Sequence, residues 1–113
     1  MQEGDLLWTP SAEVVEQANL TDYQRWLADN RGVEVGNYTE LWQWSVDNVA
    51  DFWASLCDYF DVVFSQRWET VLANKEMPGA KWFVGARLNY AENIFAKRTD
   101  AKPMMLYKGC LLY

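Results

Sequence analysis

Residues 45–60, SVDNVADFWASLCDYF, form the most regular stretch of the sequence and decide the predicted fold. Apolar residues recur there at intervals of three and four, which is the spacing of one face of an α-helix. The predicted apolar stripe consists of Val46, Val49, Phe52, Trp53, Leu56 and Phe60. The predicted polar side carries Asp47, Asn48, Asp51, Ser55 and Asp58. Ser45 is the expected N-cap of this helix, which should run to about Tyr59.

The sequence before this stretch predicts two helices with defined ends. Thr9-Pro10 is typical of an N-cap followed by proline at the first helical position, so a helix is expected from there to near Asn19. Thr21 and Gln24 match a capping box, which satisfies free backbone N–H groups at the start of a second helix. Gly32 is the expected C-terminal cap of that helix, because glycine readily adopts the left-handed conformation that ends many helices.

The remaining sequence predicts one short helix, little β-structure and a final helix. Asn37 is the expected cap of the short helix. Residues 68–72 alternate and contain β-formers, so a short strand is possible, and residues 81–85 are expected to be extended or irregular. A final helix is predicted over residues 87–97. The predicted fold class is therefore mostly α, a small helical domain with at most one or two short strands.

The charges are divided unevenly along the chain. Ten basic and sixteen acidic residues give a formal net charge of −6. Residues 1–65 hold two of the basic and twelve of the acidic residues. This acidic half lacks the basic surface that nucleic acid binding requires, and no apolar run is long enough to cross a membrane. The sequence therefore predicts a cytoplasmic protein with neither nucleic acid nor membrane as a partner.

Catalytic signatures are missing from the sequence. Histidine is absent, which removes the commonest general base and the commonest metal ligand. Cys57 and Cys110 cannot make a zinc site, and a disulfide between them is not favoured in a cytosolic protein. Asp47 and Asp51 can share a helix face, where paired carboxylates are usually solvated, and no glycine-rich phosphate loop occurs. We therefore expect no catalytic and no metal-binding residue.

The aromatic content is the most unusual feature of the composition. Seven Trp, six Tyr and five Phe occur among 113 residues. A chain of this length buries about two thirds of its unfolded surface, which is too little to hide all of these large side chains. Two interpretations remain open. Some rings lie on a surface that a partner covers, or the chain has an ordinary core with several half-buried rings.

Several motifs together carry a resemblance to a known family. They are the segments Tyr38–Val46, Phe52-Trp53 and Trp82–Asn93, and Trp8–Ser11 adds to them. In this order and spacing they resemble the N-terminal region of acetoacetyl-CoA synthetases, within the acetyl-CoA synthetase branch of the adenylate-forming enzymes. The likeness covers residues 8–108, which is almost the whole chain.

This resemblance implies a place within a larger enzyme. The full-length enzyme would activate acetoacetate with ATP to an acyl adenylate and pyrophosphate, and then transfer the acyl group to coenzyme A. The present region would be its mostly helical N-terminal cap domain, whose partner is the adenylation domain. The family's phosphate-binding loop and catalytic lysine lie after residue 113. ATP, magnesium and coenzyme A are therefore expected to belong to the full-length enzyme, and no cofactor is expected for this chain alone.

The resemblance also divides the chain into three parts. Residues 1–7 are expected to be a flexible N-terminus, residues 8–98 the helical cap domain, and residues 99–113 an apolar tail that leads into the adenylation domain. The last residues, Cys110–Tyr113, differ from the family's continuation. The sequence therefore suggests the product of a truncated or frame-shifted ligase gene, or an artificially shortened chain.

Seven side chains are candidates for docking or for a scaffold role. They are Trp42, Trp44, Trp53, Trp82, Phe83, Asn89 and Asn93. For the last four, one interpretation places them in the wall near the substrate or coenzyme A entrance. The other has the two rings anchoring the cap and the asparagines binding backbone amides. No catalytic, substrate-binding or metal-binding residue is assigned.

Three functions remain open at this point. The first is a non-catalytic N-terminal domain of an acetoacetate–CoA ligase that covers an apolar face of the adenylation domain. The second is a free-standing interaction module, which self-associates or binds another protein through exposed aromatic rings and the apolar tail. The third is an aromatic-lined binder of a small molecule.

Overall fold

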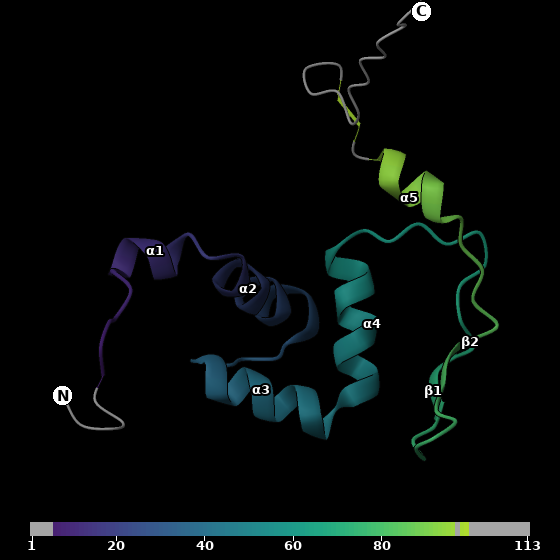
Figure 1. The fold of residues 1–113 in the computed structure, drawn as a ribbon, viewed down its shortest axis with the longest axis horizontal. Helices are drawn as coiled ribbons and strands as arrows, with labels where there is room; N and C mark the ends of the chain where they lie inside the picture. The colour runs from purple at the N-terminus through teal and green to yellow at the C-terminus, as the bar shows by residue number, and fades with distance from the viewer. Residues whose placement is uncertain (1–5, 97, 100–113) are drawn as a thin grey trace, which may run out of the picture. The chain divides into compact units, whose positions relative to one another are not determined.

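The chain forms five helices and one antiparallel hairpin within the part that the structure describes (Figure 1). The structure is a computed structural model, and it describes residues 6–96, 98 and 99. The elements in chain order are α1 (Ala12–Glu16), α2 (Asn19–Arg31), α3 (Tyr38–Asp47), α4 (Val49–Tyr59), β1 (Thr70–Asn74), β2 (Lys81–Val84) and α5 (Tyr90–Ala96). The predicted fold class, mostly α with at most one or two short strands, is confirmed.

The chain divides after Asp61 into two compact units. The helical unit, Met1–Asp61, contains α1 to α4, and the hairpin unit, Val62–Tyr113, contains β1, β2 and α5. None of the described helices is long and apolar enough to cross a membrane. The expected flexible residues 1–7 and apolar tail 99–113 lie mostly outside the described residues, so these domain boundaries stay predictions.

The starts of α1 and α2 both differ from the predicted ones. Ser11 is the N-cap of α1, and its hydroxyl accepts a hydrogen bond from the Val14 N–H (3.4 Å), so Pro10 precedes the helix. α1 also ends before its predicted last residue. Thr21 lies inside α2, where its hydroxyl donates to the Val15 carbonyl (2.5 Å). The predicted capping box is therefore wrong, because this hydroxyl donates to a carbonyl near the end of α1, which also accepts from the Ala18 N–H (3.2 Å), and caps no N–H group of α2.

Two other helix caps are confirmed. Gly32 ends α2 in the left-handed conformation (φ 63°, ψ 24°), and its N–H donates to the Ala28 carbonyl (3.2 Å). The Asn37 side chain accepts a hydrogen bond from the Glu40 N–H (3.0 Å) at the start of α3. In return, the Glu40 carboxylate accepts from the Gly36 N–H (2.7 Å). This reciprocal arrangement satisfies free donors on both sides of the cap.

The predicted break at Ser45 is wrong, because α3 continues through this residue. The Ser45 hydroxyl donates to the Trp42 carbonyl one turn earlier (2.7 Å), which is how serine is accommodated within a helix. The break falls at Asn48, whose backbone (φ −121°, ψ 51°) separates α3 from α4. As a result α3 is longer than expected and α4 begins later.

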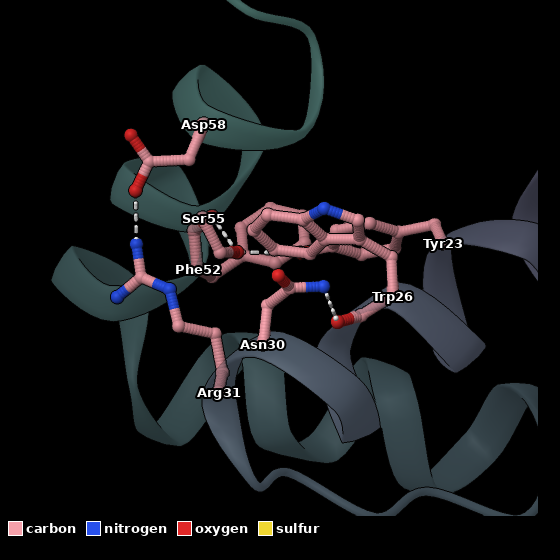
Figure 2. Close-up of polar contacts among 7 residues, drawn as sticks. All are labelled: Tyr23, Trp26, Asn30, Arg31, Phe52, Ser55 and Asp58. Carbon is pink, nitrogen blue, oxygen red and sulfur yellow. Dashed lines mark hydrogen bonds and ion pairs between the residues drawn. The ribbon is translucent and has the colours of Figure 1, made fainter.

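The core of the helical unit is small and contains a buried hydroxyl pair. Tyr23, Leu27 and Leu41 are its buried hydrophobic residues, and Ser55 is buried beside them at 1% exposure. The oxygen atoms of Tyr23 and Ser55 are 2.6 Å apart, and the Ser55 hydroxyl donates to the Phe52 carbonyl (2.7 Å; Figure 2). Because Ser55 has a single hydroxyl proton, Tyr23 is the donor of the pair. Both buried hydroxyls are therefore satisfied.

Further contacts join α2 to α4 around this core. The Tyr59 hydroxyl donates to the Asp22 carboxylate (2.7 Å), and the Tyr59 ring meets the Tyr23 ring edge to face, with centroids 5.0 Å apart. Arg31, at the end of α2, forms an ion pair with Asp58 of α4 (Figure 2). On α2 these contacts flank Tyr23, at Asp22 and Arg31, whereas on α4 both follow Ser55. They therefore add two further attachments between the same two helices.

The face of α4 that packs on the core differs from the predicted stripe. It is formed by Phe52, Ser55, Leu56 and Tyr59. Trp53 and Phe60 were predicted on the apolar stripe but are 44% and 56% exposed, and Ser55 was predicted on the polar side. The error arises because periodicity assigns serine to solvent, whereas this hydroxyl is satisfied inside the core.

The hairpin unit contains two short strands with irregular pairing. The paired residues are Thr70 and Val84, Leu72 and Trp82, and Asn74 and Lys81. The strand predicted over residues 68–72 is thus present but shifted by two residues, and the stretch expected to be extended or irregular is its partner. The Arg87 N–H donates to the Gln66 carbonyl (2.8 Å) as an isolated bridge. The final helix therefore begins at Tyr90 and not at Arg87.

The core tyrosines predict how stability depends on pH. Burial raises the pKa of Tyr23, opposed by its hydrogen bond to Ser55 and by the charge of Arg31. For Tyr59, the hydrogen bond to Asp22 raises the pKa, and burial and the Asp22 charge add to this. A pKa that is higher in the folded state stabilises the fold below the unfolded pKa, near 10, and the stabilisation is lost as pH rises through the folded pKa.

We therefore expect the free energy of unfolding to fall above about pH 10. The double variant Tyr23→Phe, Tyr59→Phe lacks both titrating groups, so its difference in stability from the natural chain should shrink above that pH. Urea unfolding followed by circular dichroism between pH 7 and 11 measures this difference. A difference that stays constant over the whole range would contradict the assignment.

Candidate docking surface

A stripe of large side chains is exposed along one side of α3. Tyr38, Trp42 and Val46 follow one another at intervals of four residues and are 67%, 51% and 50% exposed. Residues four apart lie above one another on a helix, so these three form a continuous apolar strip. Three such side chains in one strip are unusual on a surface that only water contacts.

Beside this strip, α2, α3 and α4 enclose an apolar groove of about 190 Å³. It is lined by Leu20, Tyr23, Tyr38, Leu41, Trp42, Ser45, Phe52 and Leu56. Two of the hydroxyls in this lining are already engaged, that of Tyr23 with Ser55 and that of Ser45 with the Trp42 carbonyl. The groove therefore offers mainly apolar contacts to whatever fills it.

The three candidate tryptophans of the helical unit have different surroundings. Trp42 lines the apolar groove and is half exposed. Trp44 packs against the core and meets Phe52 edge to face, with centroids 6.1 Å apart. Trp53 also meets Phe52 (5.7 Å) but leaves much of its ring exposed. The structure thus brings Trp44 and Trp53 together around one phenylalanine and places Trp42 at the groove.

The two candidate rings of the hairpin unit, Trp82 and Phe83, are the two middle residues of β2. Phe83 meets Trp68 edge to face (5.2 Å), and Trp68 in turn meets Phe64 (5.2 Å). Phe83 has a left-handed backbone (φ 47°), which is uncommon for a bulky residue inside a strand. Trp82 lies beside Phe83, with centroids 6.4 Å apart, and is 42% exposed.

The two candidate asparagines bind backbone groups of the hairpin unit. Asn89 accepts hydrogen bonds from the N–H groups of Ala91 (2.9 Å) and Glu92 (3.3 Å) at the start of α5. The Asn93 side chain accepts from the Val63 N–H (2.8 Å) and donates to the Val63 carbonyl (3.0 Å) and the Asn89 carbonyl (2.9 Å). Asn93 therefore fastens α5 to the chain segment that enters the hairpin. A role at a substrate or coenzyme A entrance stays a prediction.

A second hollow, more polar and about 620 Å³ in volume, lies between α2 and the start of α3. It is lined by Thr21, Gln24, Arg25, Ala28, Glu34, Val35, Gly36 and Glu40. Arg25 forms an ion pair with Glu16, and Glu40 accepts the hydrogen bond from Gly36 described above. The Gln24 side-chain nitrogen is buried and has no acceptor among the described residues.

Sequence reasoning missed Leu20, Tyr38 and Gln24 as surface features. The signal for Tyr38 was present, since it continues the interval of four from Val46 and Trp42. Leu20 and Gln24 carry no comparable signal, because their placement depends on how α2 packs against α3. Among the described residues, no three acidic, cysteine or histidine side chains gather to hold a metal ion. Cys110 lies outside the described part, so the expected absence of a disulfide to Cys57 stays a prediction.

Comparisons with known proteins show which family the chain belongs to. A family model described as the acetyl-coenzyme A synthetase N-terminus matches residues 38–94, which is half of the chain. The chain belongs to this acetyl-coenzyme A synthetase N-terminal family. The matching region begins with the exposed strip of α3 and ends within α5. The resemblance inferred from the sequence motifs is therefore confirmed.

Individual relatives of this family are acetoacetyl-CoA synthetases. The chain is 33% identical to the acetoacetyl-CoA synthetase of Gallus gallus and 36% identical to that of Danio rerio, over 95% of its own length. It spans 16% of each of these relatives. The structure is also similar to acetoacetyl-CoA synthetase from Streptomyces lividans, with a TM-score of 0.71 and 45% identity over 75% of this chain and 13% of that one.

The contacts of Asn93 give a testable prediction for the hairpin unit. Asn93→Leu removes the side-chain partners of Val63 and is expected to lower the free energy of unfolding by about 0.5–1.5 kcal/mol for each hydrogen bond lost. Glu92→Gln, at the exposed neighbouring position, is the control and should have little effect. Urea unfolding followed by tryptophan fluorescence measures both. Equal midpoints for the two variants would show that Asn93 does not fasten α5.

Proposed function

We propose that this chain acts as the non-catalytic N-terminal domain of an acetoacetate–CoA ligase. The observation that supports this most strongly is the apolar groove with its exposed strip on α3, in a chain of this family. Exposing such a face to water costs free energy, and a partner that covers the face removes this cost. The partner we propose is the adenylation domain, and the proposed location is the cytoplasm.

The chemistry of the full-length ligase falls outside the residues described here. Such an enzyme couples acetoacetate to ATP, forming an acyl adenylate and pyrophosphate, and the acyl group then passes to coenzyme A. Bound phosphates require free cationic groups or a glycine-rich loop. Residues 6–61 contain two arginines, and both form ion pairs with carboxylates. These residues therefore do not fit the phosphates of ATP or coenzyme A, and we assign ATP, magnesium and coenzyme A to the remainder of the enzyme.

A second candidate function is self-association as a free-standing module. The exposure of Trp53 and Phe60 on α4, in addition to the strip on α3, favours it because together they leave a large apolar area uncovered. Light scattering at tens of micromolar distinguishes the two functions. A stable dimer would favour the module, and a monomer would favour a domain that awaits its adenylation domain.

A chimera tests the first proposal directly. The corresponding N-terminal segment of the Streptomyces lividans acetoacetyl-CoA synthetase is replaced by this chain, and acetoacetate-dependent ATP–pyrophosphate exchange is measured. We expect exchange by the chimera and none by the chain alone, because the catalytic groups lie in the remainder. The unmodified enzyme and the enzyme without its N-terminal segment are the controls. Exchange by the chain alone, or a chimera no better than the shortened enzyme, would overturn the proposal.

A further inference from the structure

We propose that the apolar groove between α2, α3 and α4 binds a large apolar side chain, aromatic or branched aliphatic, from the adenylation domain of the same polypeptide. This inference rests on the proposed function and names the surface through which it operates. Trp42 and Tyr38 would then be the main contacts on the rim of the groove.

The size and lining of the groove fit one such side chain. Its volume is about 190 Å³, and an apolar cavity of about 150 Å³ is large enough to bind benzene. The hydroxyls of Tyr23 and Ser45 in its lining are hydrogen-bonded within the helical unit. An apolar group that enters the groove therefore deprives neither of these hydroxyls of its partner.

The rim of the groove has the composition of an interface centre. Tyr38 and Trp42 are more than half exposed, and Leu20 on the opposite helix is 42% exposed. Tyrosine and tryptophan are the residues that most often dominate binding energy, especially around a pocket that a partner side chain fills. Covering this rim would remove three large apolar side chains from water at once.

The charges of the helical unit exclude a nucleotide as the occupant. Residues 6–61 carry ten carboxylates against two arginines, and Arg25 and Arg31 are already paired with Glu16 and Asp58. A phosphate-bearing ligand would meet a negative surface with no free cation. An uncharged protein side chain meets no such repulsion, so it fits the groove where a nucleotide does not.

The comparisons favour the adenylation domain over a second copy of the chain. The matching segment makes up 13% of the Streptomyces lividans enzyme, so most of such a polypeptide lies outside this segment and is covalently joined to it. A joined partner acts at an effective concentration in the millimolar range. A second copy would have to compete with this. Most of the groove-lining residues, from Tyr38 to Leu56, also lie within the region that the family model matches.

Photo-crosslinking in the active chimera tests this inference. The variant Trp42→p-benzoylphenylalanine places a crosslinker on the rim, and Asp47→p-benzoylphenylalanine places one elsewhere on α3 as the matched control. After irradiation, mass spectrometry identifies the crosslinked residues. We expect the uncrosslinked peptide that contains position 42 to decrease, because it crosslinks to an apolar residue of the adenylation domain in the same polypeptide. The uncrosslinked peptide that contains position 47 should decrease much less.

Some outcomes would overturn the inference about the groove, and a different outcome would count against the proposed function. A crosslink from position 42 to another copy would assign the groove to self-association. Equal crosslinking at positions 42 and 47, or none at 42, in a chimera that catalyses exchange would show that the domain docks through a different face. A chimera without exchange activity would instead count against the proposed function.

As a second measurement, Trp42→Ala should lower the melting temperature of the chimera more than that of the chain alone.

Discussion

The hydrogen bond between the hydroxyls of Tyr23 and Ser55 is the interaction on which the helical unit depends. It joins α2 to α4 within a core that contains three buried hydrophobic residues. A core of this size supplies little hydrophobic stabilisation, so polar contacts that fix the helices carry more weight than in a larger domain. The Tyr59–Asp22 hydrogen bond and the Arg31–Asp58 ion pair add to it. Together these contacts fix α2 against α4, and both helices line the apolar groove.

Helix caps that depend on residues close together in the sequence were predictable from the sequence. The left-handed cap at Gly32 and the N-cap at Asn37 depend on residues a few positions apart, and both were predicted correctly. The serines were predicted wrongly for a common reason. Ser45 and Ser55 both satisfy their hydroxyls on a carbonyl one turn back, which lets Ser45 continue a helix and lets Ser55 enter the core. Periodicity contains no information about such bonds.

The candidate site was predictable only in part. Trp42 was expected in a docking or scaffold role, and the structure places it at the groove, yet the same expectation covered Trp44, which packs on the core. The sequence cannot distinguish Trp42 from Trp44. Which of the two rings faces solvent depends on how α2 and α4 pack against α3. Asn93 shows a similar limit. Its bonds to Val63 cross thirty residues of sequence, and nothing local indicates that contact.

A small core held by polar contacts supports an apolar face, which we propose the rest of a ligase covers. Hydroxyl-radical footprinting of the chain alone and of the chimera tests this proposal most directly, because oxidation of a tryptophan reports the exposure of its ring. The oxidation rate of Trp42 is predicted to fall in the chimera, whereas that of the half-buried Trp44 should change little. Equal oxidation rates for Trp42 in the two proteins would show that the rest of the ligase does not cover this face.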